Sequence, residues 1–160
     1  MTRFQVRKVA VLGAGVMGAQ IAAQGTADAP IVFTSSNPAG SRAPGDWGGI
    51  IIVGNGLINR TGVIFTEGPV EEAEDYGGGS DNTDNSGTIR YTRIEFAGYD
   101  VSGGANTELN ALSSYAVGSG TTYEYIQALA GLDDHFEFWG GAVDSRYLIS
   151  SESGDDHFDT

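Results

Sequence analysis

The stretch Tyr125-Ile-Gln-Ala-Leu-Ala-Gly-Leu-Asp-Asp-His-Phe136 returns 22 residues later as Tyr147-Leu-Ile-Ser-Ser-Glu-Ser-Gly-Asp-Asp-His-Phe158. The tyrosine and the phrase Asp-Asp-His-Phe are identical in the two copies. Repeats of this length are typical of solenoids, in which each repeat forms one coil and stacked coils share a core. The Leu/Asn ladder of a leucine-rich repeat is absent, and the copies are rich in strand-forming residues. We therefore predict an all-β fold, a right-handed parallel β-helix with coils of 22 residues.

A partial third copy begins at Tyr91, which lies 34 residues before Tyr125. This distance exceeds the 22-residue period by twelve residues, so we expect a loop insertion around Gly98–Gly118. Successive coils of a β-helix exchange backbone hydrogen bonds, which places equivalent side chains above one another. The register thus predicts that Phe136 stacks on Phe158 inside the core.

Short strands separated by turn residues are expected from residue 25 onward. The candidate strands are enriched in β-branched and aromatic residues, and clusters of Gly, Asn, Asp and Ser lie between them. They are Ile31–Thr34, Gly49–Val53, Val63–Thr66, Thr88–Phe96, Thr122–Leu129 and Ala142–Ser150. No amphipathic helix is evident in this region. Trp47-Gly-Gly and Trp139-Gly-Gly are a candidate further echo of the repeat.

The composition excludes several classes of protein. The chain has 160 residues, 25 Gly, no Cys and a formal net charge of -13. Without cysteine there is no disulfide framework, zinc ribbon or thiol nucleophile, and the negative charge argues against nucleic acid as a partner. The charge is uneven: residues 1–24 carry three basic groups and no acid, and the remainder carries 5 basic and 21 acidic residues. We therefore divide the chain into an N-terminal segment, 1–24, and a partial β-helix domain, 25–160.

Four phrases in the second part resemble a large bacterial family of secreted or surface β-helix proteins. They are Gly25–Ser35, Arg42–Gly49, Asp84–Gly98 and Asp133–Gly141. The resemblance covers residues 19–160. It implies a β-helix and extracellular or outer-membrane-surface localisation of a lipoprotein-like kind, and it gives no catalytic residue to assign. Proteins of this kind have further coils, so we expect the domain to be truncated at its C-terminus.

The N-terminal segment carries a different motif. An apolar run from Lys8 to Leu12 leads into Gly13, Gly15 and Gly18, spaced as G-x-G-x-x-G, the strand–turn–helix fingerprint of dinucleotide binding. Residues 6–24 resemble the opening of the 3-hydroxyacyl-CoA dehydrogenase domain of fatty-acid β-oxidation. That resemblance implies NAD contacts at the three glycines, and the strand–turn–helix motif itself predicts a helix over residues 19–23. It gives an alternative function, a fragment of a cytoplasmic NAD-dependent dehydrogenase.

Several features of the segment oppose the dehydrogenase interpretation. The acidic residue expected after the second strand is missing, because Ile31–Thr34 is followed by Ser35, Ser36 and Asn37. The two resemblances also overlap at residues 19–24, which favours a chimera. A basic start followed by an apolar stretch is, alternatively, typical of a secretory signal peptide, although the stretch is too short to span a membrane. As a third alternative, residues 19–24 form a strand and the glycines are turn residues.

The repeated Asp-Asp-His phrase is the strongest candidate for chemistry. In register, Asp133, Asp134, Asp155 and Asp156 would gather with two imidazoles along one edge of the solenoid. Calcium prefers six to eight oxygen ligands, and a cation would relieve the repulsion between stacked carboxylates. We predict a calcium site at these four residues, with solvated, backbone-capping turns as the alternative.

Two further features concern ligands. Seven acids and no base lie between Glu67 and Asp84, which indicates either a cation-binding patch or a solvated loop.

Aromatic side chains on a β-helix can stack on sugars, and the candidates are Trp47, Trp139, Tyr91, Tyr123, Tyr125 and Tyr147. The leading hypothesis is a non-enzymatic surface segment that acts in adhesion or carbohydrate contact. Open coil ends also predict self-association.

Overall fold

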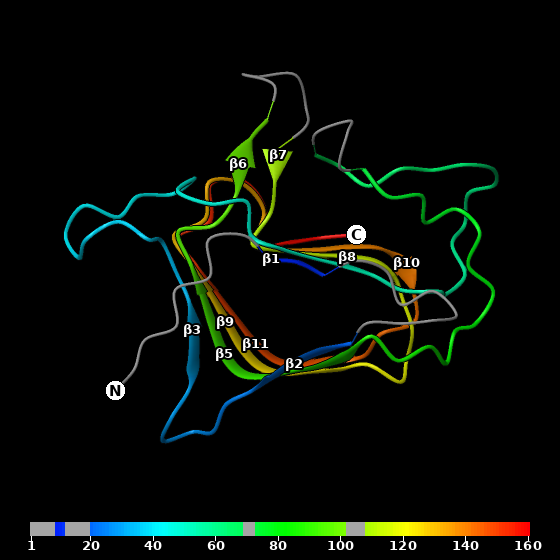
Figure 1. The fold of residues 1–160 in the computed structure, drawn as a ribbon, viewed down its shortest axis with the longest axis horizontal. Helices are drawn as coiled ribbons and strands as arrows, with labels where there is room; N and C mark the ends of the chain where they lie inside the picture. Colours follow the sequence, from blue (N-terminus) through cyan, green and yellow to red (C-terminus); the bar gives the residue numbers. More distant parts are fainter. Residues whose placement is uncertain (1–8, 12–19, 69–72, 102–107) are drawn as a thin grey trace.

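The computed structural model describes residues 9–11, 20–68, 73–101 and 108–160. All regular secondary structure in these residues is β-strand, and no helix among them is long and apolar enough to cross a membrane. Most strands belong to two parallel sheets that face each other (Figure 1). Sheet A runs in the order β1 (Val9–Val11), β4 (Ile50–Val53), β8 (Leu112–Val117), β10 (Phe136–Gly141) and β12 (Phe158–Asp159). Sheet B contains β2 (Ile21–Gln24), β3 (Ile31–Phe33), β5 (Gly87–Glu95), β9 (Thr122–Leu129) and β11 (Ser145–Ser151).

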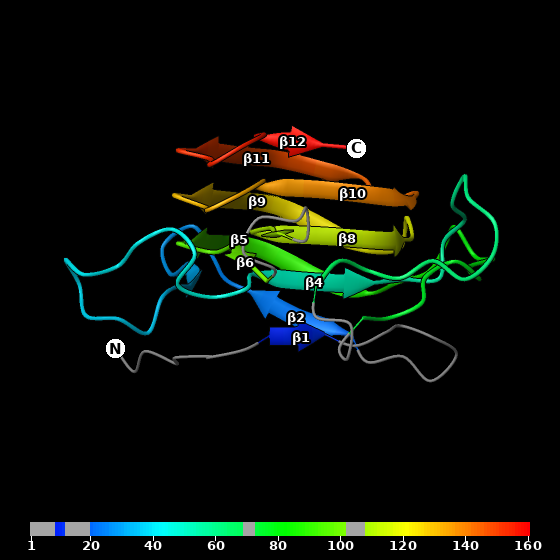
Figure 2. The ribbon, with the colours of Figure 1, turned by 90° about the horizontal axis from the view of Figure 1, so that it is seen from above.

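The chain alternates between the sheets, so each coil gives strands to both. In sheet B, β2 and β3 both pair with β5, followed by β9 and β11. The strands form successive layers from β1 at one end to β11 and β12 at the other (Figure 2). Parallel pairing throughout both sheets makes the domain a parallel β-helix, as the repeat predicts. Both strands within residues 1–24 pair with strands of the later region, β1 with β4 and β2 with β5.

The register confirms both predicted periods. Phe136 pairs with Phe158, and their rings stack with centroids 5.2 Å apart. Arg90 pairs with Glu124 across the 34-residue interval. Phe136 is fully buried, whereas Phe158 in the last layer is 51% exposed. The stacking prediction is therefore correct, and only Phe136 has neighbours on both sides, because Leu112 pairs with its other edge.

Strand prediction fails mainly in sheet A. The expected loop insertion at Gly98–Gly118 contains an antiparallel hairpin, β6 (Tyr99–Asp100) with β7 (Glu108–Leu109), and also β8 in the middle of the sheet. Strand β10 also has no counterpart among the predicted strands. Val63–Thr66 is not a strand, since it contributes only a bridge from Phe65 to Asp75. The Trp-Gly-Gly echo is also wrong, because Trp139 pairs with Tyr115 in β8, whereas Trp47 precedes β4 and bridges Ala97.

Left-handed backbone conformations mark equivalent points of successive coils. They have φ between 46° and 62° and occur at Tyr91 and Phe96, at Tyr125 and Ala130, and at Tyr147 and Glu152. Such a conformation costs a non-glycine residue about 1–2 kcal/mol. Its recurrence at the same spacing as the repeat shows that the coil bends at fixed positions.

Two apolar clusters hold the coils together. The larger one lies between the sheets, and its fully buried members include Ile50, Leu112, Ile89 and Ile126. The smaller one lies on the outer face of sheet A, where the described residues 54–68 and 73–86, called segment 54–86 below, pack against it (Figure 1). Its buried members are Val53, Tyr76, Tyr115 and Ala116. This second cluster decides which side chains on the outer face of sheet A become buried.

Candidate functional site

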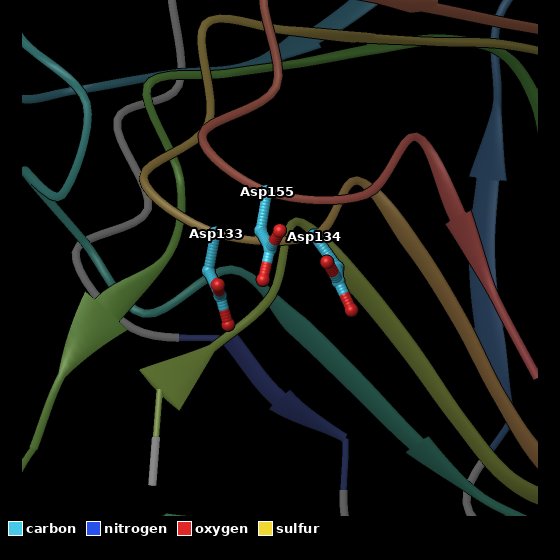
Figure 3. A group of neighbouring side chains, drawn as sticks. All are labelled: Asp133, Asp134 and Asp155. Atoms are coloured by element: carbon cyan, nitrogen blue, oxygen red, sulfur yellow. The ribbon is translucent and has the colours of Figure 1, made fainter. Parts of the chain in front are cut away.

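Three of the four predicted calcium ligands lie together at one edge of the solenoid. Asp133 and Asp134 occupy the turn between β9 and β10, and Asp155 occupies the equivalent turn before β12 (Figure 3). One carboxylate oxygen from each lies within 4.8 Å of the others. Asp134 is 8% exposed, Asp133 is half-buried and Asp155 is exposed. The group thus opens to solvent on the side of Asp155.

Asp156, the fourth predicted ligand, contributes through its backbone. Its backbone N–H donates a hydrogen bond to Asp134 Oδ1 at 2.8 Å. Ser153 Oγ lies 2.9 Å from the Asp133 carbonyl oxygen and 2.7 Å from that of Asp156, so its one proton can be donated to either carbonyl. These bonds join the two turns. Because Asp156 contributes its main chain, the carboxylate group consists of Asp133, Asp134 and Asp155.

The carboxylates of this group are held close against their mutual repulsion. Burial, followed by the charges of Asp134, Glu108 and Asp155, raises the pKa of Asp133 to about 6. Burial also raises the pKa of Asp134, opposed by the hydrogen bond from Asp156. A bound cation would favour the ionised forms and oppose both effects.

The two histidines are joined through a serine. His135 is fully buried, and its Nε2 accepts a hydrogen bond of 2.9 Å from the Gly131 N–H. A neutral His135 therefore carries its proton on Nδ1, which donates to Ser150 Oγ at 2.6 Å. Ser150 then donates to Nδ1 of the exposed His157 at 2.5 Å. Neither imidazole belongs to a carboxylate group that could hold a metal among the described residues.

The position of Ser150 could not be inferred from the repeat. Ser150 pairs with Ala128 in the preceding coil, so no repeated polar residue marks it.

Burial and the neighbouring His157 lower the pKa of His135 to about 4. The buried ring is therefore neutral at physiological pH and acts in hydrogen bonding.

Three tyrosines form a ladder on the outside of sheet B. The rings of Tyr91 and Tyr125 stack with centroids 4.5 Å apart, and those of Tyr125 and Tyr147 stack at 4.4 Å. Tyr91 is partly buried, whereas the exposed fraction of the side chain is 36% at Tyr125 and 62% at Tyr147. The Arg90 guanidinium lies over the first two rings and pairs with Glu124 at 3.2 Å. We call Tyr91, Tyr125 and Tyr147 the tyrosine ladder.

The other aromatic candidates are less available. Tyr123 is 1% exposed and Trp47 is 8% exposed. Trp139 is partly buried between Tyr115, with ring centroids 5.9 Å apart, and Arg60, whose guanidinium lies 5.4 Å from the ring centre. Only the tyrosine ladder presents several of the predicted aromatic residues to solvent as one unit.

A second acidic group lies on the outer face of sheet A, and only one of its central residues, Glu67, was singled out from the sequence. Glu137 in β10 is 5% exposed and Asn110 is 1% exposed. Asn110 Nδ2 donates to Glu137 Oε2 and lies 3.4 Å from Glu67 Oε2. Burial raises the pKa of both glutamates. Glu137 also forms a compact carboxylate group with Asp134 and Asp159.

The proposed NAD contacts Gly13, Gly15 and Gly18 lie outside the described residues. The helix expected over residues 19–23 is wrong where the structure describes the chain, because Ile21–Gln24 is strand β2. Parallel pairing of this segment with Gly87–Arg90 satisfies its backbone within sheet B. This agrees with the alternative in which residues 19–24 form a strand of the solenoid.

Comparison with protein families agrees with this architecture. The family model of the pectate-lyase-like β-helix domain matches residues 7–160 and thus includes the glycine motif. Comparisons with curated proteins and with solved structures give no match. The family match and the two parallel sheets together show that the chain belongs to the pectate-lyase-like β-helix family.

Proposed function

We propose that this chain is a non-enzymatic β-helix segment of a bacterial secreted or cell-surface protein and that it contacts glycans through the tyrosine ladder. The observation that supports this proposal is the stack of Tyr91, Tyr125 and Tyr147 on the outside of sheet B. Keeping these tyrosines in the left-handed region costs backbone energy at every coil. Stacking between the rings offsets part of that cost, and the rings of Tyr125 and Tyr147 keep aromatic surface exposed to solvent.

The ladder combines the two kinds of group that bind sugars. Tyr147 is the outermost ring and is 62% exposed, so it offers aromatic surface on which an apolar sugar face can stack. Arg90, Glu124 and Arg146 occupy paired positions beside the rings and supply donors and acceptors for sugar hydroxyls. A glycan chain lying along the ladder would contact several coils at once.

Glycan binding can be tested by isothermal titration with soluble neutral and acidic oligosaccharides, after screening on a glycan array. We expect Tyr147→Ala to weaken binding about tenfold, in line with the loss of one aromatic contact. Tyr99→Ala is the matched control, because Tyr99 is 52% exposed but lies on the β6–β7 hairpin. Equal affinity of Tyr147→Ala and the unsubstituted chain would disprove the role of the ladder.

We also propose that calcium stabilises the turns that carry Asp133, Asp134, Asp155 and Asp156. The grouping of the first three carboxylates supports this role, with Asp156 fixing Asp134 through its backbone. Millimolar calcium should raise the melting temperature in circular dichroism relative to EDTA, and Asp133→Asn/Asp155→Asn should reduce that increase. An increase of the same size in the double variant would argue against calcium at this edge.

A further inference from the structure

The last strand of sheet B carries opposite charges at its two ends. Arg146 lies near the start of β11, and Glu152 directly follows this strand and is exposed. The residue paired with Arg146 in the preceding coil is Glu124, which already forms an ion pair with Arg90 at 3.2 Å. None of the described residues forms an ion pair with Arg146 itself. The outer edge of β11 therefore presents a cation without an ion-pair partner at one end and an exposed anion at the other.

The backbone of β11 leaves hydrogen-bonding groups at the same edge. The Ala130 N–H donates to the Ser151 carbonyl at 3.0 Å, so Ser151 directs its backbone groups toward the preceding coil. The backbone groups of successive residues in a strand point to alternate sides, which leaves those of Leu148 and Ser150 at the outer edge. No described strand occupies that edge.

An antiparallel strand centred on Ile149 would satisfy both the backbone and the charges. In such a pair, Leu148 of each copy lies opposite Ser150 of the other and exchanges backbone hydrogen bonds with it. Ile149 then lies opposite Ile149, and Arg146 lies opposite Glu152, since both are three residues from the centre. A second copy of β11 is therefore a self-complementary partner for this edge.

This arrangement also covers apolar surface and separates like charges. Ile149 is 57% exposed, and pairing would bury it against its own counterpart. The acidic turn with Asp155 and Asp156 follows β11, so antiparallel pairing places it near the start of the opposite strand, where Arg146 lies. Opposite charges that face each other across an interface favour one orientation over the others.

Head-to-tail stacking of two copies lacks this complementarity. Gln24 in β2 pairs with Arg90, and the same column of sheet B continues through Glu124 to Arg146. A second copy that extended the solenoid through β2 would therefore place the neutral Gln24 against Arg146. That contact leaves the charge of Arg146 without a partner.

We infer that two copies of this chain associate through β11, whose strands pair antiparallel with Ile149 opposite Ile149 and Arg146 opposite Glu152. The two-fold symmetry of the contact provides the Arg146–Glu152 pair twice. Sheet B becomes continuous across the contact, and association through β11 stops at a dimer because each copy uses its free β11 edge. This interface does not depend on glycan binding by the tyrosine ladder.

Exchange of charges tests the orientation in the full chain. Sedimentation equilibrium should show a dimer whose affinity falls about tenfold in Arg146→Glu and in Glu152→Arg, because each variant places like charges opposite each other twice. The double variant Arg146→Glu/Glu152→Arg should recover the dimer affinity of the unsubstituted chain. Asp28→Arg changes the charge of an exposed residue on the loop after β2 and should dimerise like the unsubstituted chain.

A single cysteine tests the register. The chain has no cysteine, so Ile149→Cys introduces one thiol per copy. Opposed residues of a non-hydrogen-bonded antiparallel pair have Cα atoms about 4.5 Å apart, a distance that a disulfide can span. Ile149→Cys should therefore form a covalent dimer in oxidised glutathione. Val63→Cys, at a position that is 68% exposed but lies on segment 54–86, should remain without a covalent partner.

Circular dichroism checks that each variant keeps the β-sheet signal. An unsubstituted chain that stays monomeric, or a double charge variant that binds no better than the single variants, would overturn the inference. Equal cross-linking of Ile149→Cys and Val63→Cys would overturn it as well. Cross-linking through Tyr147→Cys but not through Ile149→Cys would also contradict it, because Tyr147 lies opposite Ser151 in this register.

Discussion

Single glycines determine how closely neighbouring coils approach. Gly49 immediately precedes β4, has a φ of +79° and lies against the backbone of Asn110 in the next coil. A Cβ atom at this position would lie 1.9 Å from the Asn110 carbonyl oxygen. Gly40 has a similar φ of +88°, but no atom lies within 4 Å of the place that its Cβ would take. The two positions separate the effect of backbone strain from that of steric clash.

Gly49→Ala should therefore destabilise the protein far more than Gly40→Ala. We expect a loss on the order of 3 kcal/mol or more for Gly49→Ala, because strain and clash with fixed backbone combine. Gly40→Ala carries only the left-handed strain and should cost about 1 kcal/mol. Urea unfolding followed by circular dichroism measures both values. Equal losses would show that the coils can separate at Gly49 without penalty.

Among the structural elements, segment 54–86 has the largest effect on burial because it packs on the outer face of sheet A. This packing covers Glu137, which lies on the outer face of β10 and would otherwise be solvated. Burial is the largest cause of its raised pKa, and the charges of Glu67, Asp134 and Asp159 act in the same direction. The folded state therefore retains a proton on this group at a pH where the unfolded chain has lost it.

This proton uptake predicts how stability depends on pH. The contribution of Glu137 is fully present below pH 4.5, its ordinary pKa, and is lost as pH rises towards the raised value in the folded state. In EDTA, the free energy of unfolding should fall between about pH 5 and about pH 8 by at least about 1 kcal/mol more than in Glu137→Gln. His135 acts in the opposite direction between its lowered pKa of about 4 and pH 6.5, and it is common to both proteins. Parallel pH profiles for the two would contradict the prediction.

At the scale of the whole molecule, the two sheets end in layers with an unpaired strand edge. Strands β11 and β12 form the final layer in Figure 2, and no described strand pairs with their outer edges. Three large apolar side chains of this layer are more than half exposed: Tyr147, Ile149 and Phe158. An exposed strand edge that carries apolar side chains is a template for pairing with another chain.

We expect the chain to self-associate through this layer. Sedimentation velocity should show dimers or larger species that decrease in Ile149→Lys, because a charged residue on an edge strand opposes edge-to-edge pairing. Val63→Lys is the control, since Val63 is 68% exposed but lies in segment 54–86. A monomer at all concentrations, or an equal effect of both lysines, would argue against association through β11 and β12.

The sequence determined the architecture because the repeat and the fold share one period. Tyr125 and Tyr147, or Phe136 and Phe158, are identical pairs 22 residues apart, and a β-helix places such pairs in contact. The same argument predicts that Asp133, Asp134, Asp155 and Asp156 gather at one edge, and the carboxylates of the first three do so. It failed for β8, whose Leu-Ser-Ser-Tyr-Ala-Val sequence does not copy β10 although the two strands pair.

The contacts that the repeat does not encode depend on how the coils and the insertions between them pack together. Ser150 lies between two histidines, and Glu67 reaches Glu137 and Asn110 from a segment that has no counterpart in the other coils. Burial of Glu137 depends on segment 54–86 folding over the outer face of sheet A, and a strand pattern alone assigns that face to solvent. Periodicity places residues along the solenoid axis, whereas the path of an insertion depends on side-chain packing between distant segments.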